Sequence, residues 1–159
     1  MRDFVEISLG IIIAFLLYTV IGKVSFSFSQ LLNFFTLVVI YFAVVKGELY
    51  GALIGTVCGL IQDSFSLGIF GVSGLAKTLI GFFAGFVAER INILPLIRNF
   101  IFIFVLISGE ITFSIFLYYF ISAEYVSEIT PLILLQPLCT AFLGSLVFLL
   151  LRKFKVLGS

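Results

Sequence analysis

The sequence predicts an all-α integral membrane protein, a compact bundle of six transmembrane helices that forms one domain over residues 1–159. Hydrophobic residues make up 62% of the chain and charged residues only 11%, whereas soluble domains carry about 25% charge. The apolar residues form runs of span-like length, separated by short polar stretches. The basic residues gather at alternate ends of these runs, which predicts that both termini are cytoplasmic.

The first three spans are predicted at residues 4–21, 28–45 and 49–62. Gly22 and Lys23 close the first run. Because no small-residue cleavage site follows this run, we interpret it as a retained span rather than a removable signal peptide. The third run has 14 residues, or about 21 Å of helix, which is short for a hydrocarbon core of about 30 Å.

The last three spans are predicted at residues 71–88, 101–121 and 131–151. Glu89 and Arg90 end the fourth run, and an acidic stretch at 124–128 follows the fifth. The sixth run begins at Pro131, where proline is tolerated because a helix start has no use for its missing N–H.

The distribution of basic residues supports this count of spans. With six spans and a cytoplasmic N-terminus, Lys23 is the one basic residue in the outer segments, and Lys77 lies within a span. The inner segments then contain the other seven: Arg2, Lys46, Arg90, Arg98, Arg152, Lys153 and Lys155. A merely re-entrant third segment would turn the basic tail outward, against the positive-inside rule.

Glycine is concentrated at residues 47–85, which contain nine of the 14 glycines. Four of them recur at every fourth position, and two more repeat the spacing: Gly47, Gly51, Gly55 and Gly59, then Gly81 and Gly85. Such spacing keeps small residues near one helix face, where they allow helices to pack closely in lipid. We predict a tight helical hairpin with Asp63 near its tip. Whether this ridge packs internally or faces a partner stays open.

Three ionisable residues lie inside or at the end of an apolar run: Asp63, Lys77 and Glu110. Charges in a bilayer are costly, so each is a candidate for a specific role. Lys77 has two possible partners, Asp63 across the turn and Glu110 deeper in the fifth span. We favour a structural brace or a partner contact over a ligand site or a proton relay.

Catalysis finds little support in the sequence. The chain has no histidine, and Cys58 and Cys139 do not form a CxxC pair, so we predict no catalytic residue, cofactor or metal site. Ser73 and Lys77 stand at helical spacing, and a lipid-modifying enzyme that uses them or Asp63 ranks last among the hypotheses. The basic tail is explained by topology, and we predict no binding to nucleic acid.

One stretch resembles a known family. The segments GALIG (51–55), GLIQD (59–63), LG (67–68) and GLAK (74–77), followed by two spaced glycines, resemble the core pattern of the rod shape-determining protein MreD family. The candidate structural or partner-contact residues are those of this pattern together with the deeper acid: Gly51, Gly55, Gly59, Asp63, Gly68, Gly74, Lys77, Gly81, Gly85 and Glu110.

The resemblance implies a non-enzymatic scaffold in the bacterial inner (cytoplasmic) membrane. Such a scaffold would be surrounded by membrane lipids and would bind an MreC-like bitopic protein. It would thereby help to couple MreB filaments to the transpeptidase and glycosyltransferase of cell-wall elongation. The family also looks distantly like the substrate-binding subunits of energy-coupling-factor vitamin transporters, which gives an alternative function.

Overall fold

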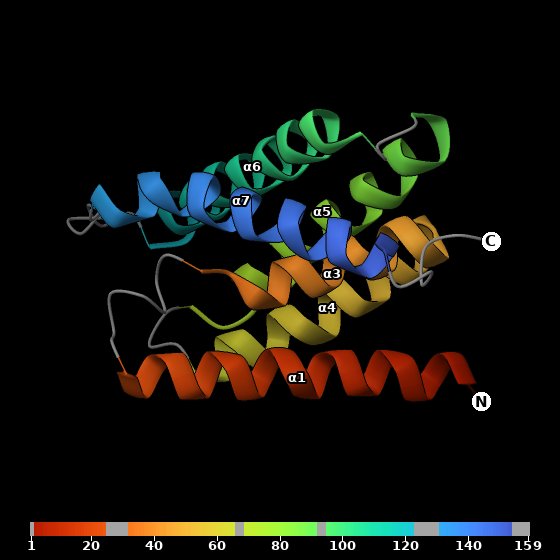
Figure 1. Ribbon diagram of the computed structural model, residues 1–159. Helices are drawn as coiled ribbons and strands as arrows, with labels where there is room; N and C mark the ends of the chain where they lie inside the picture. Colours follow the sequence, from red (N-terminus) through yellow and green to blue (C-terminus); the bar gives the residue numbers. More distant parts are fainter. Residues whose placement is uncertain (1, 25–31, 66–68, 92–94, 123–130, 154–159) are drawn as a thin grey trace.

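The apolar runs fold into helices in the computed structural model, which describes residues 2–24, 32–65, 69–91, 95–122 and 131–153 (Figure 1). The described residues contain six helices and confirm the predicted all-helical fold. The helices are α1 (Arg2–Val24), α3 (Phe34–Lys46), α4 (Glu48–Phe65), α5 (Val72–Arg90), α6 (Leu96–Ser122) and α7 (Pro131–Lys153).

Each of the six described helices extends beyond its predicted span at one end or both, whereas α3 begins only at Phe34, inside the predicted span 28–45. Helix α4 continues to Phe65, so its 18 residues are about 27 Å long. Helix α6 begins at Leu96, directly after Pro95, and the Asn99 N–H donates to the Pro95 carbonyl at 2.9 Å. Proline suits a helix start because its φ is fixed near the helical value and a first turn needs no N–H from it. The segment between the predicted fourth and fifth spans therefore contains the start of a helix.

Among the described residues, two helical stretches are long and apolar enough to cross a membrane, Val72–Arg90 and Leu96–Ile121. Three further apolar stretches are shorter: Val5–Val20, Phe34–Lys46 and Leu135–Leu150.

Helix α3 occupies the centre of the bundle. It packs on α1, α4, α5 and α7, while α4 packs against α5 and α6 against α7 (Figure 1). Phe35, Val39 and Phe42 join one apolar cluster with α1 and α4. Ile40 and Ala43 join another with α5, α6 and α7. A helix that is apolar on all sides belongs in the interior, and α3 is such a helix.

A single residue, Gly47, separates α3 from α4. Its φ is +95°, a left-handed conformation that glycine adopts without a Cβ penalty. The Gly47 N–H donates to the Ala43 carbonyl at 3.0 Å and so completes the end of α3. Because the reversal takes one residue, α4 folds back directly along α3.

Candidate functional site

The glycine ridge lies between α4 and α5. At five of its positions, an added Cβ would come closer than 3.0 Å to backbone atoms of the facing helix or its start: Gly51, Gly55, Gly59, Gly81 and Gly85. Gly51 and Gly81 oppose each other, and each Cβ would meet the other residue's carbonyl oxygen. The two backbones are in direct contact there, so this ridge packs within the chain rather than facing outward.

Two other glycines of the pattern behave differently. A Cβ at Gly74 would meet the end of the flexible Leu60 side chain at 3.3 Å, which is a milder restriction than contact with backbone. Gly68 lies outside the described residues.

A side-chain hydrogen bond also joins α4 and α5. The hydroxyls of Thr56 and Thr78 are 2.8 Å apart.

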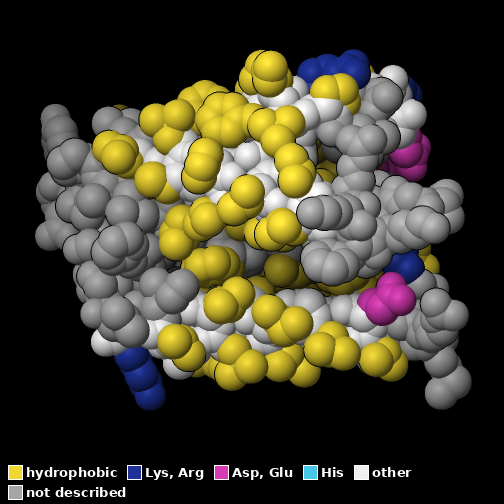
Figure 2. Space-filling view, in the orientation of Figure 1, with side chains coloured by type: hydrophobic (Ala, Val, Ile, Leu, Met, Phe, Trp, Pro, Cys, Tyr) yellow, Lys and Arg dark blue, Asp and Glu magenta, His cyan; other side chains and the backbone are white. Residues whose placement is uncertain are grey.

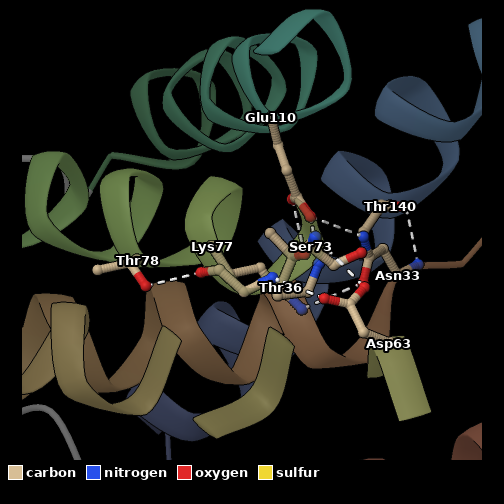
Figure 3. A network of polar contacts seen from close by, with 9 residues as sticks. Asn33, Thr36, Asp63, Ser73, Lys77, Thr78, Glu110 and Thr140 are labelled. Atoms are coloured by element: carbon tan, nitrogen blue, oxygen red, sulfur yellow. Dashed lines mark hydrogen bonds and ion pairs between the residues drawn. The ribbon is translucent and has the colours of Figure 1, made fainter. Parts of the chain in front are cut away.

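Asp63 caps the start of α5 from the end of α4 (Figure 3). Its carboxylate accepts backbone N–H bonds from Gly71 at 2.8 Å, Ser73 at 3.3 Å and Gly74 at 3.2 Å. The N-cap position itself is Gly71, which has no side chain to do this. A helix N-terminus has unpaired N–H groups and a positive dipole end, so a buried carboxylate at this point is well compensated.

Lys77 reaches the other predicted acid. Its ammonium donates to Glu110 Oε1 on α6, and both residues are at least 96% buried (Figure 3). Of the two pairings that the sequence left open for this lysine, the structure contains the one with Glu110. The three predicted charges are thus divided between a helix cap and an ion pair.

Short polar side chains complete the environment of Glu110. Thr36 Oγ1 donates to Glu110 Oε2 at 2.7 Å, and Asn33 Nδ2 donates to Oε1 at 3.3 Å. The Asn33 N–H in turn donates to Thr140 Oγ1 on α7 at 3.4 Å. The cluster of Asn33, Thr36, Lys77, Glu110 and Thr140, hereafter the polar cluster, therefore joins α3, α5, α6 and α7.

Three members of the polar cluster were not predicted from the sequence, namely Asn33, Thr36 and Thr140. Asn33 had a readable signal, because asparagine just before an apolar run is a typical N-cap. It performs this role, since Asn33 Oδ1 accepts the Thr36 N–H at 3.3 Å. Nothing comparable marks the two threonines, whose importance depends on the helices that they meet.

The polar cluster resembles a brace more than a reactive site. A buried ion pair is tolerated when further hydrogen bonds satisfy its atoms, and the Glu110 carboxylate accepts from three donors. The Lys77 ammonium that a Ser73–Lys77 dyad would need is engaged by α6. In the part of the chain that the structure describes, no group of three histidine, cysteine or acidic residues could hold a metal ion.

Two of the cavities that described residues line open on the surface of the bundle. The larger, of about 820 Å³, lies between α1, α3 and α7, and Figure 2 shows hydrophobic side chains around the hollow above α1. The smaller, of about 280 Å³, lies beside α4 and α5. Neither is lined by Asp63, Lys77 or Glu110, so the buried charges do not face a ligand pocket in these two places.

Comparison with known proteins gives one match. The family described as rod shape-determining protein MreD matches residues 2–154. Neither the curated proteins nor the solved structures gave a significant match to the chain.

Proposed function

The chain belongs to the MreD family of rod shape-determining membrane proteins, and from this premise we propose that it is a non-enzymatic scaffold of the cell-wall elongation complex. The family match over nearly the whole chain carries the proposal. The buried polar groups support it, because their hydrogen bonds and ion pair hold helices together. A scaffold needs this kind of rigidity, whereas a transporter or an enzyme needs polar groups that face a substrate.

The proposed topology has six membrane spans with both termini in the cytoplasm, in the bacterial inner (cytoplasmic) membrane. The seven-to-one distribution of basic residues supports it. The fold is compatible with it, because α1 begins and α7 ends at the same end of the bundle (Figure 1). The 13 residues of α3 give only about 20 Å of helix, so this span would need a thinned bilayer or shielding by its neighbours.

The proposed partners follow from the family rather than from a surface of the chain. An MreC-like bitopic protein would bind directly, and through it the elongation transpeptidase and glycosyltransferase would be linked to MreB. Exposed apolar side chains on the outer faces of α5 and α6, such as Leu75, Phe83 and Val105, are available for contacts within the membrane. The glycines of the ridge are not available for such contacts, because they lie in the interface between α4 and α5.

The vitamin-transport alternative receives no specific support. A polar vitamin requires a pocket with converging hydrogen-bonding groups. The larger cavity is lined by apolar residues and glycines apart from Glu6, Tyr41 and Lys46. The smaller one offers the hydroxyls of Thr56 and Thr78, which already bond to each other.

Depletion in a rod-shaped bacterium tests the proposal. Cells without the protein should become round, and wild-type protein supplied from a plasmid should restore rods. The tagged protein, purified in mild detergent, should retain a single-span periplasmic partner. Unchanged cell shape after depletion, or copurification with a transport ATPase and a bound vitamin instead, would contradict the proposal.

A further inference from the structure

The ion pair of Lys77 and Glu110 joins two consecutive helices. These are α5 and α6, the two described helices that contain a stretch long and apolar enough to cross a membrane. Helix α5 ends at Arg90 and α6 begins at Leu96, so the connection between them is short. Lys77 is 1% exposed and Glu110 4%, and the ammonium points toward α6 (Figure 3). The pair therefore links two neighbouring helices inside the bundle.

The two helices differ in how well each could enter a membrane alone. A charged lysine or acid at the centre of a span cancels the favourable contribution of about seven Leu, Ile, Phe or Val residues. Helix α5 has eight residues of these four types, whereas α6 has 17. An unpaired Lys77 leaves almost nothing to favour the insertion of α5. An unpaired Glu110 leaves α6 with a surplus of about ten such residues.

The lysine does not lower this cost in the usual way. A lysine near the end of a span can extend its ammonium to the membrane surface. Lys77 is the sixth residue of α5, about 8 Å from the start of the helix. Its ammonium instead donates to Glu110, the fifteenth residue of α6, which is about 21 Å from that helix's start. The charge is thus compensated only when α6 is in the membrane as well.

The helix before α5 offers no substitute for Glu110. In the part of the chain that the structure describes, Glu110 is the acid to which Lys77 donates. Asp63, at the end of α4, accepts from backbone N–H groups at the start of α5. The rest of the α4–α5 contact consists largely of glycines against backbone, which brings close packing but no charge for the lysine. Helix α5 therefore depends on the helix that follows it.

We propose that the Lys77–Glu110 pair is an insertion device: α5 enters the membrane together with α6, and Glu110 keeps it there by binding the Lys77 ammonium. This inference rests on the topology proposed above, in which α5 and α6 both span. It makes the two residues unequal. Loss of Glu110 leaves a marginal span with an unpaired lysine, whereas loss of Lys77 leaves an acid on a helix that is apolar enough to span without help.

Labelling of the corner between α5 and α6 tests this inequality. Ile97→Cys introduces a thiol at the start of α6, at a position that is 73% exposed. The thiol faces the cytoplasm when α5 spans the membrane and the outside when it does not. A membrane-impermeant maleimide, added to spheroplasts that contain the full-length protein, reaches only the second form. The protein without this substitution gives the background from Cys58 and Cys139.

We expect Glu110→Met to expose the corner in up to about half of the molecules, because the gain and the cost of inserting α5 then nearly cancel. Arg90 and Arg98 beside the corner favour the cytoplasmic side for the remainder. Lys77→Met breaks the same ion pair but should stay at background, and so should the variant with both changes. Thr112→Met is the matched control, since Thr112 is an exposed residue of α6 whose hydroxyl bonds to its own helix.

If Glu110→Met is degraded before it can be labelled, Glu110→Gln is labelled directly after a short pulse of synthesis and should expose the same corner. Background labelling of the Glu110 variants would overturn the inference. So would equal labelling of Lys77→Met and Glu110→Met, because a brace alone treats the two changes alike. Labelling of the Ile97→Cys protein with its ion pair intact would overturn the underlying topology. The scaffold function is judged separately, by cell shape and by the copurifying partner.

Discussion

Two regions of the bundle are held together by different means. Helices α4 and α5 meet backbone to backbone through glycines, and the polar cluster beside them satisfies its charges internally. Helix α1 packs mainly on α3 through bulky apolar side chains such as Ile11 and Phe15, and its outer face remains exposed. In the first region the close backbone contact allows only one arrangement of the helices, whereas in the second region side chains can be replaced without moving the helices. Substitutions should therefore have large effects in one and small effects in the other.

Removing one member of the buried ion pair should have the largest effect. Lys77→Met leaves the Glu110 carboxylate buried with its cation gone, which costs about 3–5 kcal/mol. Changing both residues to methionine should recover most of this loss, because no uncompensated charge is left. Thermal unfolding in detergent, followed by circular dichroism, measures both. A double variant as unstable as the single one would mean that the pair itself is indispensable.

A bulky side chain in the glycine ridge should have the second-largest effect on stability. The Cβ of Gly55→Leu would meet the Lys77 carbonyl group and the Thr78 amide nitrogen, so the helices must separate, at a cost of about 3 kcal/mol. The control is Gly22→Leu, since a Cβ added at Gly22 on α1 would have nothing within 4 Å. Membrane abundance should fall for the first variant and stay normal for the second. Equal abundance would show that α4 and α5 are not in close contact.

Removing the cap of α5 should have an intermediate effect. Asp63→Ala leaves the N–H groups of Gly71 and Gly74 without their carboxylate, at a cost of about 1–2 kcal/mol. Ser64→Ala is the neighbouring control, because that hydroxyl bonds to its own helix at an exposed position. The same unfolding measurement applies. A stability loss that is no larger for the aspartate variant than for the serine variant would show that the Asp63 carboxylate does not stabilise the start of α5.

The smallest effect is expected on the outer face of α1. Ile12 is 55% exposed, so Ile12→Ala should change the unfolding free energy by no more than about 0.5 kcal/mol. A loss comparable to that of the ridge variant would mean that this face is covered by another chain when the measurement is made. Repeating it with and without the copurifying partner would then locate that contact.

Much of this fold could be predicted from the sequence. Apolar runs identified the helices, and the four-residue glycine spacing predicted a tight hairpin of α4 and α5, although it left open whether the ridge packs internally or faces a partner. The charges of Asp63, Lys77 and Glu110 stood out because an apolar run makes any charge conspicuous. The sequence did not decide which acid Lys77 meets, since this depends on how α6 lies against α5. It also gave no weight to Thr36 and Thr140, because threonines are ordinary in such helices until a carboxylate or a backbone amide is brought to them.

The central claim is that the buried charges hold helices in a passive scaffold and do not act on a ligand or a proton. The most direct test is the Lys77→Met, Glu110→Met double variant, produced in cells depleted of the native protein. The account predicts that the variant accumulates in the membrane, retains its partner and restores rod shape. A variant that accumulates and binds its partner normally, yet leaves the cells round, would contradict the claim, because the charges would then be needed for something other than packing.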